Sequence, residues 1–143
     1  MTTIAQARTA AIKGVLLDTW APAQGINLSR IELQNEGVKP GPPIGSAPWF
    51  RVADRPGPRR QECLGGPGAR RFVAWSILFI QIFVPLGGGT VASSNLAQSL
   101  VDVFEGVQIV GLEILSADVR DIGPDGQWYS TNVEITYQYR ETK

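Results

Sequence analysis

An apolar run near the middle of the chain, residues 72–84, limits the folds that this sequence can adopt. The run holds 13 residues between glycine-rich segments and ends before Pro85. A continuous apolar run between turn signals is typical of a strand that is buried on both faces. It is too short to cross a bilayer as a helix, which needs about 20 apolar residues. We therefore expect a strand at the centre of a sheet.

The composition argues against several classes of protein. The 13 Lys and Arg residues balance the 13 Asp and Glu residues, so the overall charge gives no sign of nucleic-acid or membrane-surface binding. The absence of histidine and the single cysteine, Cys63, argue against His-based catalysis, a disulfide framework and Cys/His zinc sites. The N-terminus lacks a basic segment followed by an apolar core, so no secretory signal is expected. We expect no catalytic residues, no cofactor and no bound metal.

The first part of the chain predicts a helix followed by a long connection. Apolar residues of segment 4–20 recur at spacings of about 3 and 4, as on one face of an amphipathic helix. Thr2 or Thr3 can cap its start, and Pro22 is expected to end it. Residues 21–48 are rich in proline and read mostly as a loop, with a short edge strand over residues 29–34.

The only concentration of basic side chains follows a short strand predicted over residues 49–53. Residues 54–68 are rich in proline and glycine, so we expect them to be a long irregular segment. A cluster of arginines can contact phosphates, but the tip of this segment has no aromatic side chains for base stacking. A solvated hairpin tip is the simpler interpretation, and a protein partner is the favoured functional one because arginine is enriched at interfaces. The arginines concerned are Arg55, Arg59, Arg60, Arg70 and Arg71.

A second glycine cluster, Gly87 to Gly89, lies between the apolar strand and a helical pattern. Ser93 or Ser94 is expected to cap this helix, and Gly106 to end it. A strand, a glycine loop and a helix N-terminus can hold phosphate. The lysine of a Walker motif and the spacing of a dinucleotide fingerprint are both missing, so a tight turn is the better interpretation.

The C-terminal part predicts further strands. Residues 107–119 read as a mixed strand segment and residues 123–126 as a turn. Apolar and polar residues alternate over 131–140, which predicts a strand with one buried face and one polar face that lies toward an edge or meets a hydrated partner. The elements together predict an α+β fold: a single domain over residues 1–143, with a mixed, mostly antiparallel sheet packed by two helices and with long loops.

The sequence offers one candidate metal site and one candidate nucleophile, and the neighbouring residues complete neither. The spacing of Asp118, Asp121 and Asp125 does not match a calcium-binding loop, so turn formation explains these residues better. Cys63 has no neighbouring base that would make it a nucleophile.

Short motifs follow one another in a fixed order along most of the chain. They are Leu33-Gln34-Asn35, Pro42-Pro43, Pro48-Trp49-Phe50-Arg51-Val52, Gln61 to Gly66, Arg71-Phe72, Val73 to Gly87, and Asn132 to Tyr137. Each motif is short, but the ordered set is fairly specific. It resembles the tail terminator family of long-tailed bacteriophages and of related phage-like particles such as gene transfer agents.

The resemblance implies a structural virion protein and not an enzyme. It implies a hexameric ring that caps the head-proximal end of the tail tube, stops tube polymerisation and provides a surface for head–tail joining. The implied partners are other copies of the chain, the tail tube protein and a head completion or connector protein. DNA would pass through the lumen without specific binding, and no membrane is involved. The implied location is the neck region of the virion tail, after assembly in the bacterial cytoplasm.

We expect the contacts of such a ring in two loops, residues 37–46 and 54–68, loosely ordered in the free subunit and fixed on docking. The expected interface residues are Arg55, Arg59, Arg60, Arg70, Arg71 and Lys39. Another ring-forming connector or tube component remains an alternative, because fold alone does not fix function. A small nucleic-acid-binding module, with the arginines on phosphates, is a further alternative.

Overall fold

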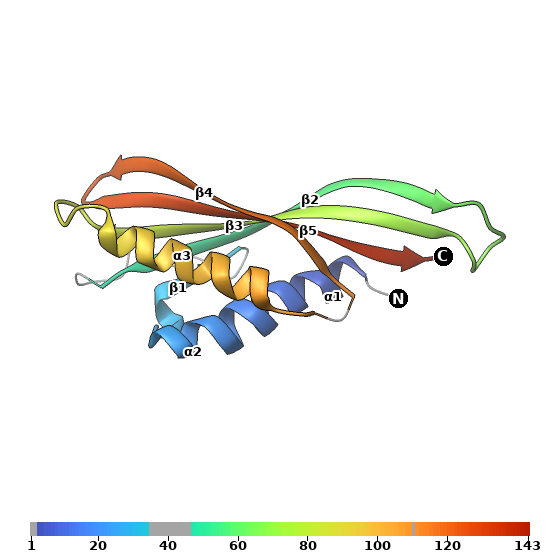
Figure 1. Cartoon of the computed structure of the whole chain (residues 1–143), viewed down its shortest axis with the longest axis horizontal. Helices are drawn as coiled ribbons and strands as arrows, with labels where there is room; N and C mark the ends of the chain where they lie inside the picture. Colours follow the sequence, from blue (N-terminus) through green and yellow to red (C-terminus); the bar gives the residue numbers. More distant parts are fainter. Residues whose placement is uncertain (1–2, 35–46, 110) are drawn as a thin grey trace.

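The computed structural model describes residues 3–34, 47–109 and 111–143. These residues form one five-stranded sheet with helices packed on one side (Figure 1). The strands are β1 (Ile31–Leu33), β2 (Trp49–Cys63), β3 (Arg71–Pro85), β4 (Glu113–Asp125) and β5 (Trp128–Thr142). They lie in the order β1-β2-β3-β5-β4, and only the β1–β2 pair is parallel. The predicted α+β fold with a mixed, mostly antiparallel sheet is confirmed.

The N-terminal helix runs through three consecutive segments, α1 (Ile4–Arg8), the π-helix η1 (Thr9–Trp20) and α2 (Ala21–Gln24). Thr3 caps it: its side-chain oxygen accepts the N–H of Gln6 at 3.2 Å, and the Gln6 side chain accepts the N–H of Thr3 at 2.9 Å. The predicted end at Pro22 is wrong. Pro22 lies just after the junction of η1 and α2, and the chain stays helical through it to Gln24. The helix ends at Gly25, whose φ of 68° is left-handed.

Strand β2 corrects the predicted irregular segment 54–68, because the strand continues to Cys63. A 3-10 turn, η2 (Leu28–Arg30), leads into β1, which confirms the predicted edge strand but pairs only with residues 50–52. The rest of β2 is therefore an edge among the described elements. An edge strand tolerates proline, since its outward N–H groups need no partner. A register shift between Pro56 and Arg59 accommodates Gly57 and Pro58.

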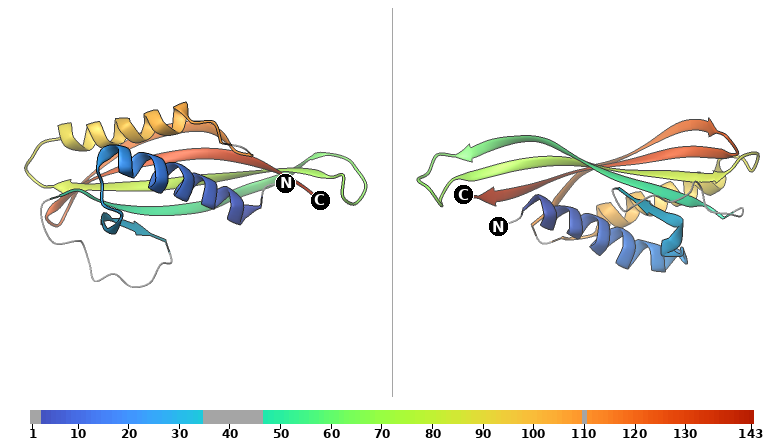
Figure 2. Two further views of the ribbon diagram at one scale, coloured as in Figure 1. Left: turned by 90° about the horizontal axis from the view of Figure 1, so that it is seen from below. Right: turned by 180° about the vertical axis from the view of Figure 1, so that it is seen from behind.

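Strand β3 lies between β2 and β5 at the centre of the sheet, as predicted. The helices cover only one of its faces (Figure 2). The even-numbered residues from Ala74 to Val84 are buried, whereas Trp75, Ile77 and Phe79 on the other face are half-buried. The prediction of burial on both faces is wrong, because the sheet carries helices on one side only.

The main core fills the space between the sheet and the two helical segments. Trp20 is 1% exposed and meets Phe50 edge to face, with ring centroids 5.1 Å apart. Its indole N–H donates to the hydroxyl of Ser99 at 2.9 Å, which ties the N-terminal helix to α3 (Val91–Gly106). Both helices thus share one core with the sheet.

Helix α3 begins after the second glycine cluster, where Gly87 and Gly89 have φ angles of 93° and 76°. Thr90 is the cap residue, so the predicted cap at Ser93 or Ser94 is wrong. Both serines lie inside the helix, and the Ser93 hydroxyl donates to the Thr90 carbonyl at 3.1 Å. The predicted end at Gly106 is confirmed.

The β4–β5 hairpin differs from the prediction at its start and at its turn. β4 begins at Glu113 and continues through Gly123 and Pro124, with a register shift next to Gly123. The chain reverses at Gly126 and Gln127, and Gly126 has a φ of 64°. The polar residues of β5 lie on the side of the sheet away from the helices, and β4 forms the adjacent edge.

Candidate interaction surface

The side of the sheet that no described helix covers is called the open face. Residues paired across neighbouring strands point to the same side, so the strand register defines its members. A half-buried column on β3 comprises Trp75, Ile77, Phe79 and Gln81. A polar column on β5 comprises Asn132, Glu134, Thr136 and Gln138. On the other side of β3, strand β2 contributes Arg51, Arg55 and Arg60.

Two of the predicted interface arginines lie over aromatic rings of the open face. The guanidinium carbon of Arg55 lies 5.5 Å from the ring centroid of Phe79, and that of Arg60 lies 5.5 Å from the ring of Trp75. Neither arginine has a carboxylate within ion-pair distance among the described residues. A stacked guanidinium keeps N–H donors at its edge, where they suit a carboxylate or a phosphate. The pair can therefore meet an anionic partner without first breaking an internal ion pair.

An aromatic cluster closes one end of the open face. Trp49, which is 4% exposed, stacks on Phe83 at 4.1 Å and meets the edge of Trp128 at 6.2 Å. The Arg51 guanidinium lies 5.3 Å from the Trp49 ring and 5.5 Å from the Phe83 ring. Together with residues 125–128, these side chains line a hollow of about 450 Å³. Tryptophan and arginine are the residues most enriched at interface hot spots.

Arg51 belongs to this surface but was not among the predicted interface residues. Side chains alternate along a strand, so the sequence of residues 49–53 would have placed Arg51 on the polar face and Phe50 and Val52 on the other face. The pattern alone could not show that this side joins Arg55 and Arg60, because the intervening segment reads as a loop.

The structure separates the other predicted residues from this group. Arg59 lies next to Glu141 in an ion pair, and the hydrogen bond to Glu141 raises the pKa of Arg59. Arg70 donates from Nε to the carbonyl of Gly65 at 3.1 Å, in the connection between β2 and β3. Arg71 is exposed at the start of β3, and Lys39 lies outside the described residues. An interface role for all of these residues stays a prediction.

A buried polar cluster centres on Asp54, on the side of β2 that faces the helices. Asp54 is 2% exposed, and one of its carboxylate oxygens accepts the hydroxyls of Ser76 at 2.9 Å and Tyr137 at 2.8 Å. The other oxygen accepts Nε of Arg8 at 2.6 Å, and the backbone N–H donates to Gln34 at 2.9 Å. Because Arg8 of the N-terminal helix and the Ser76 and Tyr137 hydroxyls of the sheet all donate to this carboxylate, the cluster fixes the helix on the sheet.

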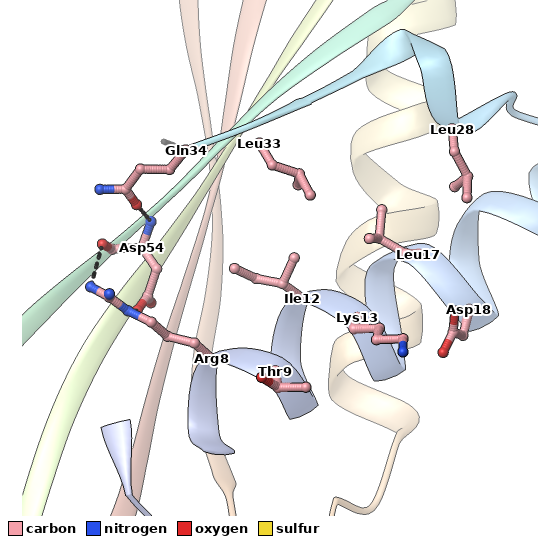
Figure 3. A pocket seen from close by; sticks show the side chains of 10 residues that line it. All are labelled: Arg8, Thr9, Ile12, Lys13, Leu17, Asp18, Leu28, Leu33, Gln34 and Asp54. Atoms are coloured by element: carbon pink, nitrogen blue, oxygen red, sulfur yellow. Dashed lines mark hydrogen bonds and ion pairs between the residues drawn. The ribbon is translucent and has the colours of Figure 1, made fainter. Parts of the chain in front are cut away.

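A groove of about 590 Å³ opens beside this cluster, between the N-terminal helix and the β1 side of the sheet (Figure 3). Its walls mix aliphatic and charged side chains. They comprise Arg8, Thr9, Ile12, Lys13, Leu17, Asp18, Leu28, Leu33, Gln34 and Asp54. Within the described part of the chain, no three His, Cys, Asp or Glu side chains gather as metal ligands would. No described helix is long and apolar enough to span a membrane.

Tyr137 makes this cluster sensitive to alkaline pH. Burial raises the pKa of the Tyr137 phenol above its ordinary value of about 10, and the hydrogen bond to Asp54 adds to the rise. Above about pH 10 the unfolded chain loses this proton while the folded chain keeps it, so the free energy of unfolding falls as the pH rises further. Tyr137→Phe is expected to remove this part of the fall. At neutral pH the same substitution is expected to lower the free energy of unfolding by about 1 kcal/mol. Urea unfolding at several pH values from 8 to 11 measures both effects; parallel pH curves for the two proteins would contradict the assignment.

Comparisons with known proteins identify one family and support the fold. The sequence model of the family described as phage tail terminator protein matches residues 8–137. A comparison with curated proteins finds no match. A solved structure is 14% identical to this chain, with a TM-score of 0.64, and the match covers 100% of this chain and 99% of that one. At this identity the solved structure supports the fold alone, whereas the family match spans nearly the whole sequence. The chain therefore belongs to the phage tail terminator family and is a structural protein of a phage tail.

Proposed function

We propose that the protein forms a hexameric ring on the head-proximal end of the tail tube, stops tube polymerisation and provides the surface for joining to the head. The observation that carries this proposal is the family match over residues 8–137. The proposed partners are other copies of the chain, the tail tube protein and a head completion or connector protein. The proposed place is the neck of the virion, in a phage or in a phage-like particle such as a gene transfer agent, after assembly in the bacterial cytoplasm.

The architecture supports this function because it offers several different surfaces to protein partners. One side of the sheet carries the helices, the other is the open face, and the sheet has two unlike edges at β4 and at the distal part of β2. A ring needs heterologous contacts, in which one patch of a subunit docks on a different patch of the next and the rotation closes. The balanced charge of the chain supports passage of DNA through the ring without specific binding.

Assembly of tail tubes from purified tube protein tests this function. Added before growth, the protein is expected to shorten the tubes in proportion to its concentration, because each ring removes one growing end. Electron microscopy of tube lengths measures the effect, and heat-unfolded protein is the control. Unchanged tube lengths would contradict termination, and long tubes formed by this protein alone would identify it as a tube subunit.

A further inference from the structure

The two long edges of the sheet carry opposite charge. Beyond its pairing with β1, β2 holds three arginines against two acids, and one of those acids, Asp54, is buried against Arg8. β4 holds four acids against one arginine, Arg120, which lies 3.9 Å from Glu134 of its own sheet. Apart from Asp54, all of these charged residues of the two strands are exposed. One edge of the molecule is therefore basic and the opposite edge acidic.

The charged residues of the two edges also repeat with the same spacing. On the part of β2 that is an edge among the described strands, the register partners of Arg55 and Arg60 along β3 are four residues apart, about 13 Å. Along β5, the partners of Glu113 and Asp118 are likewise four residues apart. Glu113 lies 3.1 Å from Arg140 of its own sheet, whereas Asp118 has no ion-pair partner among the described residues. All four side chains belong to the open-face side, since their register partners do. Copies placed side by side with their open faces continuous can therefore match arginine to carboxylate.

Strand β4 also exposes apolar surface that a neighbour would cover. Leu115, Val119 and Ile122 are 49%, 50% and 54% exposed. They account for three of the eight large apolar residues that are exposed in the described part of the chain. An exposed edge strand with apolar side chains is a template for association.

We infer that the β2 edge of one copy docks on the β4 edge of the next, with Arg55 and Arg60 facing Asp118 and Asp125, two exposed acids of β4 on the open-face side. This inference rests on the ring proposal and names the surfaces that form the ring. Opposite edges of one sheet give a head-to-tail contact, which closes into a ring if the rotation per copy allows it. Pro56 and Pro58 remove N–H donors from the β2 edge, so side chains carry the contact there in place of a continuous hydrogen-bond ladder.

Two charge-reversed double variants test the docking. R55D/R60D makes both edges acidic on balance, and D118R/D125R makes both edges basic on balance, so each variant alone brings edges of like net charge together at the contact between copies. Each is expected to raise the apparent dissociation constant for self-association at least tenfold, because like charges at an interface are strongly repulsive. A one-to-one mixture restores complementary contacts only between different variants. It is expected to recover association as alternating rings with an even number of subunits.

Sedimentation velocity and native mass spectrometry measure these assemblies for the wild type, for each variant and for the mixture. D102R/E105R on exposed positions of α3 is the matched control and is expected to associate like the wild type. Circular dichroism checks that every variant is folded. Wild-type association is expected to weaken as salt is raised.

The outcomes separate this inference from the function on which it rests. Association of either variant alone at the wild-type level, or a mixture that regains nothing, would overturn the edge contact. If such variants still shorten tail tubes, the terminator function stands and only the assignment of its surfaces fails. If the wild type stays monomeric at every concentration and does not shorten tubes, both proposals fail.

Discussion

Replacement of Asp54 by alanine is expected to lower the free energy of unfolding by about 3 kcal/mol. The substitution removes the acceptor that the hydroxyls of Ser76 and Tyr137 share in the core. The buried Tyr137 hydroxyl, left without this acceptor, costs about 1–3 kcal/mol, whereas the Ser76 hydroxyl can still donate to the carbonyl of Arg55 at 3.0 Å. The side chain of Arg8 is 39% exposed and can be rehydrated, so its loss adds less.

Urea unfolding of D54A and of the wild type at pH 7 gives this difference directly. D118A, an exposed aspartate of the same sheet, is the matched control and is expected to stay within about 0.5 kcal/mol of the wild type. D54N keeps an acceptor oxygen for the hydroxyls, so its free energy of unfolding is expected to lie between those of D54A and the wild type. A loss below about 1 kcal/mol in D54A would show that the cluster does not hold the N-terminal helix on the sheet.

Replacement of Trp20 by alanine is expected to lower the free energy of unfolding by about 3–5 kcal/mol. This is the largest effect of any substitution considered for this chain. Trp20 is among the largest fully buried side chains, and alanine would leave a cavity between both helices and the sheet. The substitution also removes the edge contact with Phe50 and the hydrogen bond to Ser99. Thermal and urea unfolding of W20A measure the loss.

A second tryptophan on the other side of the sheet supplies the matched control. Trp75 on the open face is only half-buried and has no helix above it, so W75A is expected to cost clearly less than W20A. W20F keeps a ring against Phe50 but loses the hydrogen bond, and is expected to lie between W20A and the wild type. Equal losses in W20A and W75A would contradict a core on one side of the sheet only.

Elements with a sustained hydrophobic period could be predicted from the sequence. The N-terminal helix, α3 and β5 follow periods near 3.6 or 2, and β3 is a continuous apolar run between turn signals. Their ends were less predictable. Pro22 and Gly123 read as breaks, yet the helix continues past Pro22 to Gln24, and β4 accommodates Gly123 through a register shift.

The distal part of β2 could not be predicted, because tertiary pairing decides its structure. Residues 54–63 contain two prolines and a glycine that locally favour a loop, but fifteen-residue β3 offers this segment a partner along its whole length. Asp54 was therefore assigned to a loop, although it is buried in the core. The arginines were predicted as a cluster, whereas their division between the open face, an ion pair and the hairpin end depends on strand register.

The position of the protein on a growing tail tube tests termination most directly. A cysteine introduced at the exposed α3 position Asp102, with the only native cysteine, Cys63, replaced by serine, can carry a gold label away from the proposed β2 and β4 contacts. Electron microscopy of tubes grown with labelled protein is expected to show label at one end of each short tube and none along the shaft. Label spread along the shaft, or unlabelled tubes of normal length, would contradict the account.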